Sequence, residues 1–162
     1  EAGSSFEENA IAKATAYVGL GRLPTLAEDS GLEVDALGGE PGVYSARYAG
    51  AGATDADRIR YLLSRMEGIP RDKRTARFRC VIALALSGDR LEIFSGECEG
   101  IISFEPRGSF GFGYDPVFYL PEMGKTMAEI PREIKNQISH RFKAAQKARH
   151  FLEQWAREEI RK

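Results

Sequence analysis

Residues 78–86 constrain the fold of this chain more than any other segment, because apolar side chains alternate along them with the period of a β-strand. One face of this strand carries only apolar side chains, namely Phe78, Cys80, Ile82, Leu84 and Leu86. The other face is apolar after Arg79, so that face too is predicted to be largely buried. Residues 87–90 have turn composition, and the apolar residues at 91–94 predict an antiparallel return.

Segments with helical periodicity lie before and after this strand pair in the sequence, and the helices that they predict could cover the sheet. The first helix follows a capping-box pattern of Ser5 and Glu8, and the second begins at the N-cap residue Thr54. The predicted elements are helices over 4–18, 54–66 and 142–155, a third strand over 99–105 and a loop over 106–116. The pattern predicts one α/β or α+β domain over residues 1–162, with a mixed sheet.

Composition excludes several classes of protein. With 162 residues, 43% hydrophobic and 29% charged content, the chain can bury a core of ordinary size, which excludes a disordered tail. The net charge is −1 and no basic stripe with interleaved aromatic residues is present, so nucleic-acid binding is not expected. No apolar run reaches the roughly 18 residues of a membrane span, and no signal peptide is visible.

These observations favour a cytoplasmic protein without membrane contact. Cys80 and Cys98 agree with a reducing compartment, because their spacing matches neither a metal site nor a CxxC motif. Each lies in a strand-like stretch and is predicted to be a buried core thiol.

An acidic segment at residues 28–31, with the sequence EDSG, interrupts apolar residues on both sides. Extended segments over 23–27 and 32–37 flank it, and it is predicted to be a turn between them. Burying a polar group without a partner costs about 2–7 kcal/mol, so carboxylates here are expected to have a ligand or a chemical role. Their oxygens suit Mg²⁺, and a carboxylate can also act as a general base. The alternative is a polar turn with Ser30 and Gly31 at its tip.

A second block, GFGYDP at residues 111–116, combines glycines with aromatic residues. The glycines allow backbone to approach a ligand closely, and Phe112 and Tyr114 can sandwich a flat ring. Asp115 could accept hydrogen bonds from that ring. The alternative is an ordinary loop whose two aromatic side chains fill the core.

A third block, KNQISHR at residues 135–141, brings potential cations to the start of the last helix, with Ser139 as a plausible N-cap. Cations at a helix N-terminus oppose its dipole, so helix stability explains them poorly. Lys135, His140 and Arg141 would suit a phosphate or a carbonyl oxygen. His140 by itself would more often be a structural histidine. A fourth block, residues 42–47, offers Arg47 for phosphate or an interface, with ordinary surface as the alternative.

Together the blocks indicate a metal-assisted reaction on an anionic, ring-bearing small molecule, and a nucleotide has these features. In order along the chain, they resemble the signature blocks of inosine/xanthosine triphosphate pyrophosphatases. The matching segments are 26–37 (LAEDSGLEVDAL), 38–50 (GGEPGVYSARYAG), 111–118 (GFGYDPVF) and 135–141 (KNQISHR), with 4–13 (SSFEENAIAK) and 124–129 (GKTMAE) also fitting. The likeness covers nearly the whole chain.

The resemblance implies hydrolysis of non-standard purine nucleoside triphosphates, such as ITP, dITP and XTP, to the monophosphate and pyrophosphate. It implies an elongated, two-lobed α/β fold, with a long central mixed β-sheet flanked by helices. It further implies Mg²⁺ as the cofactor and a homodimer as the assembly.

The resemblance also implies roles for individual residues. Asp29 matches the general base and a metal ligand, Glu1 matches a second acidic metal ligand, and Ser30 matches a substrate contact. The residues matching the nucleotide pocket are Phe112, Gly113, Tyr114, Asp115, Lys135, His140 and Arg141. Asp29 would help to deprotonate a water that attacks the α-phosphorus, with pyrophosphate leaving.

The sequence departs from the family pattern in two places. Glu28 replaces the first aspartate of the common DDSGL form, which leaves its role open between ligand and supporting partner. Family members begin with a strand and a Thr/Ser-x-Asn-x-x-Lys loop that grips the triphosphate, and this pattern does not precede Glu1. The domain is therefore expected to be N-terminally incomplete, and its phosphate-binding lysine is not identified.

Two alternatives stay open at this point. A septum-inhibitor-like pyrophosphatase would share the architecture but act on modified pyrimidine triphosphates. A non-catalytic module would bind a nucleotide in the same pocket without turnover. Pyrophosphate release across a panel of nucleotides distinguishes these possibilities.

Overall fold

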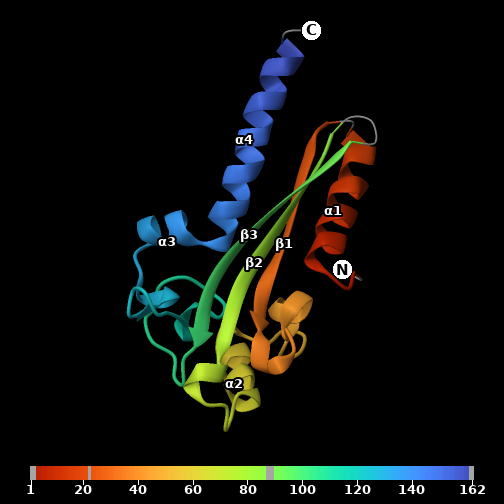
Figure 1. Cartoon of the computed structure of the whole chain (residues 1–162). Coiled ribbons are helices and arrows are strands. Elements are labelled where there is room, and N and C mark those ends of the chain that lie inside the picture. Colours follow the sequence, from red (N-terminus) through yellow and green to blue (C-terminus); the bar gives the residue numbers. More distant parts are fainter. Residues whose placement is uncertain (1–2, 22, 87–89, 161–162) are drawn as a thin grey trace.

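The computed structural model describes residues 3–21, 23–86 and 90–160 (Figure 1). Within these residues, five strands form one sheet in the order β1-β2-β3-β4-β5. The strands are β1 (Thr25–Val34), β2 (Thr75–Ala85), β3 (Leu91–Ile102), β4 (Phe118–Leu120) and β5 (Lys125–Thr126). The helices are α1 (Phe6–Gly21), α2 (Asp55–Arg65), α3 (Arg132–Ile138) and α4 (His140–Ile160).

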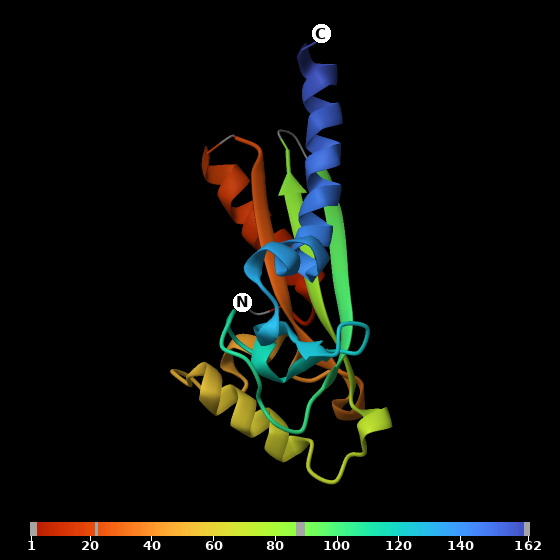
Figure 2. The same cartoon turned by 90° about the vertical axis from the view of Figure 1, so that its left-hand side faces the viewer.

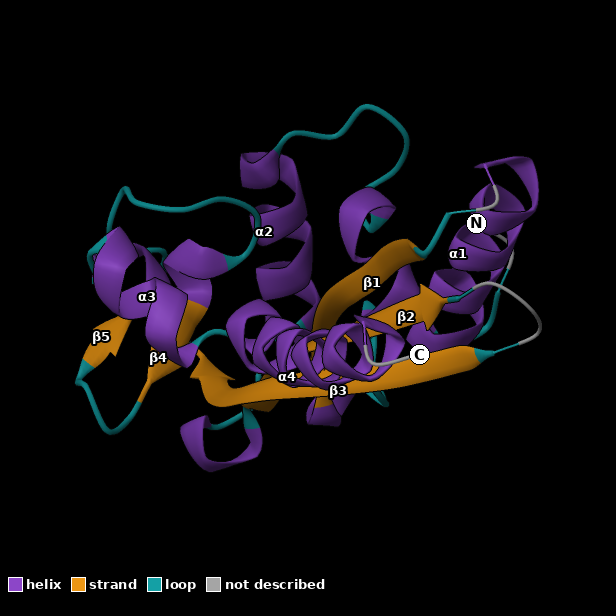
Figure 3. Cartoon of the chain, turned by 90° about the horizontal axis from the view of Figure 1, so that it is seen from above, coloured by secondary structure: helices purple, strands orange, loops and turns teal. Residues whose placement is uncertain are grey.

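Helices cover both faces of the three long strands, with α1 on one face and α4 on the other (Figures 1 and 3). The alternation of β2 explains this arrangement, because its odd and even residues each present apolar side chains. Val81, Ala83 and Ala85 pack with α1, and Cys80 and Ile82 pack with α4. The prediction that the strand is buried on both faces is confirmed.

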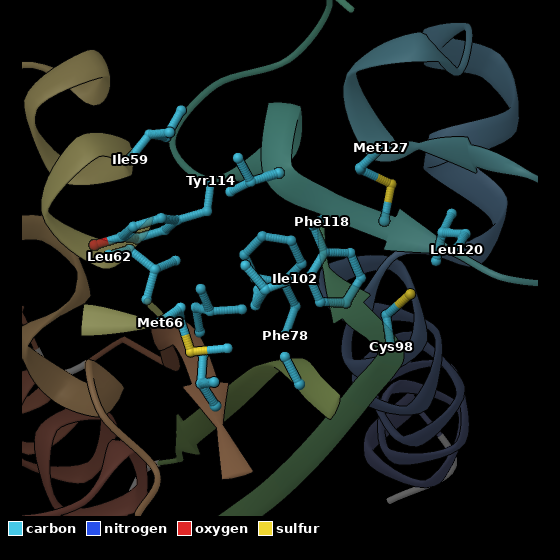
Figure 4. Close-up of a cluster of buried hydrophobic side chains, with 14 of the residues drawn as sticks. Ile59, Leu62, Met66, Phe78, Cys98, Ile102, Tyr114, Phe118, Leu120 and Met127 are labelled. Carbon is cyan, nitrogen blue, oxygen red and sulfur yellow. The ribbon is translucent and has the colours of Figure 1, made fainter. Parts of the chain in front are cut away.

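The helices α1 and α4 cover one end of the long strands. A second packed region lies at the opposite end, where α2 and the short strands β4 and β5 come together (Figure 2). Its core joins side chains from distant parts of the sequence (Figure 4). Ile59 and Leu62 of α2 belong to this cluster, as do Phe78 of β2 and Phe118 of β4. The long strands β1, β2 and β3 thus lie between α1 and α4 at one end and contribute to this second core at the other.

The sheet is antiparallel throughout the part of the chain that is described, whereas a mixed sheet was predicted. The connections give the reason. A short segment joins β2 to β3, and residues 35–74 turn at one end of the sheet, so that β2 returns beside β1. Such connections produce antiparallel pairs, since a parallel pair needs a crossover along the whole sheet. The α/β class with flanking helices is confirmed.

β1 runs without interruption through residues 28–31, so the predicted turn was wrong. Gly31 is needed for close packing instead. A Cβ at Gly31 would lie 2.5 Å from Ser45 Oγ and 2.6 Å from Gly42 O. The 3-10 turn Gly42–Arg47 therefore rests directly on the strand, and Ser45 Oγ accepts a hydrogen bond from Leu32 N at 2.9 Å.

Other sequence-based expectations agree with the structure. Thr54 caps α2 and forms a capping box with Asp57. Ser139 Oγ accepts from Phe142 N at 3.2 Å, as expected for the cap of the last helix. Cys80 and Cys98 are both free and buried. One expectation was wrong: residues 99–105 do not form a separate third strand, because the antiparallel return continues as the single strand β3 from Leu91 to Ile102.

Candidate active site

A cavity of about 650 Å³ opens where β1, α2, the 111–115 loop and the start of α4 meet. All eight side chains or backbone positions predicted to contact the substrate line this cavity: Ser30, Phe112, Gly113, Tyr114, Asp115, Lys135, His140 and Arg141. They come from three separate blocks of sequence. The structure therefore brings these blocks to one site, and their roles in binding stay predictions.

The acidic segment divides between the two faces of β1, because side chains alternate along a strand. Glu28 and Ser30 contact Arg141 of α4, whereas Asp29 contacts Asn9 and Lys13 of α1. We call the first set, Glu28, Ser30 and Arg141, the α4-face group, and the second set, Asn9, Lys13 and Asp29, the α1-face group. The adjacent carboxylates of Glu28 and Asp29 therefore have different surroundings. Both groups nevertheless lie along the same edge of the described sheet, because β1 is its edge strand.

The α4-face group fixes a guanidinium at the cavity wall. Arg141 Nε lies 3.1 and 3.2 Å from the two carboxylate oxygens of Glu28, and Arg141 Nη2 donates to Ser30 Oγ at 2.9 Å. Burial alone would raise the pKa of the Glu28 carboxyl, but the hydrogen bond and charge of Arg141 outweigh it and lower this pKa. Cys80 Sγ also donates to Glu28 at 3.2 Å. Burial, with this carboxylate beside it, raises the pKa of the Cys80 thiol to about 12, so Cys80 remains a thiol.

The α1-face group holds the Asp29 carboxylate from two sides. Asp29 is 9% exposed and accepts from Asn9 Nδ2 at 3.1 Å and from Lys13 Nζ at 2.8 Å. Lys13 Nζ also donates to Glu28 O at 3.1 Å. The orientation of Asp29 is thus fixed by a charge and an amide, which is the kind of support that a catalytic carboxylate needs.

The 111–115 loop is built around a buried aspartate. Asp115 is 3% exposed, accepts from Phe112 N at 2.9 Å and forms an ion pair with Lys135. Gly111 has φ +79°, and a Cβ there would lie 2.0 Å from Asp115 Oδ2, so this position requires glycine. These contacts leave the Phe112 ring 60% exposed, with Lys135 Nζ 4.8 Å and Arg141 Cζ 5.4 Å from its centroid.

Tyr114 points away from this exposed ring and into the core. It is 4% exposed, and its hydroxyl donates to Ser45 O at 2.8 Å. Burial raises the pKa of this phenol, which keeps the hydroxyl protonated and able to donate. Phe112 is therefore the exposed aromatic ring of this loop at the cavity, and Tyr114 anchors the loop.

His140 is neutral, whereas the sequence analysis counted it among the potential cations. It is 7% exposed and stacks on Phe78 with ring centroids 5.0 Å apart. Burial first, and then the charges of Arg141 and Lys135, lower its pKa to about 3. Its Nδ1 is buried and has no hydrogen-bond partner among the described residues. A buried polar nitrogen of this kind in a cavity wall is suited to a ligand.

Several residues at or beside this site were not predicted from the sequence. Asn9 and Lys13 are four residues apart on the buried side of α1, next to the apolar positions Phe6 and Ala10, and this spacing was a usable signal. Asn9 is only 2% exposed. Asp55 and Arg58 line the cavity itself, but nothing in the sequence pattern of α2 distinguished them from ordinary helix-start residues.

Asp29 is the predicted metal ligand that lies among the described residues. It offers hard carboxylate oxygens, and Mg²⁺ commonly takes one or two protein carboxylates and completes its shell with water and phosphate. Among the described residues, no group of three or more His, Cys, Asp or Glu side chains could hold a metal by itself. This donor set fits an ion that arrives with a phosphate ligand. Glu1, the second predicted metal ligand, lies outside the described residues.

Comparison with known proteins agrees with this geometry. A model of the Ham1 family matches residues 1–151. The dITP/XTP pyrophosphatase of Geobacillus kaustophilus is 55% identical over 155 residues, which are 96% of this chain and 74% of that protein. The dITP/XTP pyrophosphatase of Bacillus subtilis is 49% identical over 153 residues, which are 94% of this chain and 77% of that protein.

Solved structures share the fold as well as the sequence. The Staphylococcus aureus Ham1 protein superposes with a TM-score of 0.91 at 46% identity, covering 94% of this chain and 79% of that one. A Ham1 protein from Coxiella burnetii gives a TM-score of 0.90, also at 46% identity, covering 95% of this chain and 79% of that one. The matched sequence contains the cavity, the α1-face group and the α4-face group, and the chain belongs to the Ham1 family.

Proposed function

We propose that this protein hydrolyses dITP, ITP and XTP to the nucleoside monophosphate and pyrophosphate. The observation that carries the proposal is the cavity itself, in which an exposed aromatic ring and hydrogen-bond donors adjoin a strand that bears a fixed carboxylate. Relatives at 49% and 55% identity are named dITP/XTP pyrophosphatases, which supports the same activity here.

The purine base would stack on Phe112, whose ring is the exposed aromatic surface at the cavity. The cationic groups of Lys135 and Arg141 lie over this ring and would donate to the 6-oxo group, and the buried Nδ1 of His140 would offer a further polar contact. Adenine carries an amino group at the same position and would leave those donors unpaired. Mismatches of this kind can discriminate by about 10⁴.

The phosphates would pass along the edge of β1 toward the α1-face group. Asp29 would accept the proton of a water that attacks the α-phosphorus, the oxygen–phosphorus bond to the pyrophosphate would break, and pyrophosphate would leave. Lys13 Nζ, 2.8 Å from Asp29 Oδ1, would orient this carboxylate and would add positive charge near the phosphates. Mg²⁺, held by Asp29 and the substrate, would neutralise phosphate charge.

The test is pyrophosphate release from the purified chain with Mg²⁺ and a panel of nucleotides. We expect turnover of ITP, dITP and XTP to exceed that of ATP, whose purine lacks the 6-oxo group, by at least about 10²-fold in kcat/KM. A preference for dUTP or another pyrimidine nucleotide would instead favour the septum-inhibitor-like alternative. Tight binding of ITP without pyrophosphate release would favour the non-catalytic module. Omitting Mg²⁺ tests the ion, and activity that is unchanged in EDTA would exclude it.

We further propose a cytoplasmic homodimer, as the sequence analysis expected. Light scattering of the purified chain tests the assembly, and a monomeric mass at micromolar concentration would contradict it. In the described residues, no helix has the length and apolar composition that a membrane span requires.

A further inference from the structure

We propose that Asp55, in the first turn of α2, is a positioning residue that holds the 111–115 loop in the conformation that receives the purine base. This inference deepens the proposed function and rests on it. It concerns a residue that lies on a different helix from every base contact proposed above, and that reaches the loop across 58 positions of sequence.

The contact joins a carboxylate to a backbone amide of the loop. Gly113 N donates to Asp55 Oδ2 at 2.6 Å. Hydrogen bonds to an ionised acceptor are shorter and about twice as strong as neutral ones. The hydrogen bond from Gly113 lowers the pKa of the Asp55 carboxyl, so this acceptor is charged at neutral pH.

The other oxygen of Asp55 is fixed within α2 and its surroundings. Asp55 Oδ1 forms an ion pair with Arg58. Arg58 Nη1 in turn donates to Ala46 O at 3.0 Å and to Ala53 O at 2.6 Å. The carboxylate therefore has a fixed position on the α2 side and one oxygen directed at the loop, and both Asp55 and Arg58 line the cavity.

The position of Phe112 depends on this contact. Its own amide is held by Asp115 within the loop, and the next amide, Gly113 N, is held by Asp55 from outside the loop. Gly113 has φ +62°, and a Cβ there would meet no atom of the described residues within 4 Å, so packing adds little to hold this backbone. Tyr114, which follows, is anchored beside Ile59 and Leu62 of α2 (Figure 4). Asp55 thus fixes the residue between the stacking ring and the anchor.

A different explanation is that Asp55 only stabilises the start of α2 through the helix dipole. Asp57 provides a matched control for this explanation. It lies in the same turn and accepts from Thr54 N at 2.9 Å and from Thr54 Oγ1 at 2.6 Å. Asp57 is not among the described residues that line the cavity. Loss of Asp57 should therefore affect α2 as strongly as loss of Asp55, but not the loop.

The experiment measures hydrogen exchange of the Gly113 amide, together with KM and kcat for ITP, in Asp55→Ala, Asp55→Asn and Asp57→Ala. We expect Asp55→Ala to speed Gly113 exchange and to raise KM about tenfold with kcat within about twofold. Asp55→Asn retains an acceptor oxygen, so its Gly113 exchange rate and its KM should both lie close to the wild-type values. Asp57→Ala should lower Tm while leaving exchange and KM unchanged. If Asp55→Ala does not fold, Asp55→Ser takes its place, because serine suits a helix start but is too short to reach Gly113.

Unchanged Gly113 exchange in Asp55→Ala, or in Asp55→Ser where that variant replaces it, would overturn the inference, and so would equal effects of Asp55→Ala and Asp57→Ala. The exchange measurement needs no turnover. A wild-type chain that fails to hydrolyse ITP would therefore refute the proposed function, while exchange would still decide whether Asp55 holds the loop.

Discussion

The two faces of β1 place adjacent residues in different surroundings. On the α4 face, Glu28 pairs with Arg141, whose guanidinium is also shared with Ser30 at the cavity wall. On the α1 face, Asp29 is held by Asn9 and Lys13. The α4-face group adjoins the residues proposed to contact the purine base. The α1-face group contains Asp29, the proposed general base that would deprotonate the attacking water. Under the proposed function, the period of the strand would separate substrate selection from chemistry within a single acidic segment.

The largest expected effect tests the α1 face. Asp29→Asn removes the proposed general base while keeping the shape of the side chain, so kcat for ITP should fall by about 10³-fold. Because Asp29 lies away from the base contacts, the ITP/ATP ratio should stay the same in whatever activity remains. Steady-state pyrophosphate release measures both quantities, and circular dichroism checks the fold.

Asp35→Asn is the matched control for this substitution. Asp35 follows β1 directly, and its carboxylate pairs with Thr75 and Arg77 away from the cavity. It should retain wild-type turnover. Near wild-type hydrolysis by Asp29→Asn would remove Asp29 from the mechanism.

The next effect tests the α4 face. Arg141→Ala removes a donor to the 6-oxo group and should raise KM for ITP by about 10- to 100-fold, since hydrogen bonds to charged groups contribute about 1.5–3 kcal/mol. KM for ATP should rise much less, so the ITP/ATP ratio falls. Lys143→Ala is the control, because Lys143 is on the same helix and donates to Glu97 O at 2.8 Å, outside the cavity lining. Equal rises in KM for both nucleotides would end the assignment of base selection to Arg141.

A third test uses pH, because His140 adjoins the α4-face group. Its pKa is about 3 when folded and 6.5 in the unfolded reference, so between these values the unfolded chain binds more protons. Stability should therefore decrease as pH falls below about 6.5, by up to about 1.4 kcal/mol per pH unit from this residue. The free energy of unfolding, measured with urea from pH 7 to 5, should depend less steeply on pH in His140→Gln than in the wild-type protein. Parallel curves for the two proteins would contradict a buried, neutral His140.

The smallest effect concerns the partner of Arg141. The Glu28 and Arg141 side chains are 40% and 43% exposed, and ion pairs of this exposure contribute about 1 kcal/mol or less. Glu28→Gln should raise KM for ITP only about two- to fivefold and leave kcat unchanged, which would make Glu28 a positioning residue. A loss of kcat comparable to that of Asp29→Asn would show that both carboxylates take part in the chemistry. Glu33→Gln is the control, since Glu33 is on β1 near Arg77 and Arg79.

Local patterns predicted the three longest helices, β2 and the start of β3, and three local blocks contained eight of the residues that line the cavity. The alternation at 78–86, the Thr54 cap and the Ser139 cap depend on neighbouring residues, and all three agree with the structure. The turn at 28–31 was wrong, because charged residues were taken to end a strand, whereas partners on α1 and α4 allow the strand to continue. Sequence alone does not show such partners, because Arg141 is 113 positions from Glu28.

By itself the sequence determined which residue types reach the site: carboxylates on a strand, an aromatic glycine loop and cations before a helix. The identities and local spacing of these residues indicate the kind of site, and the order of the blocks along the chain indicates the family. Only the tertiary structure decided which carboxylate meets which cation, that His140 is neutral, and that Asp55 reaches Gly113. Those properties arise from burial and from contacts between distant segments, and neither is encoded in the spacing of neighbouring residues.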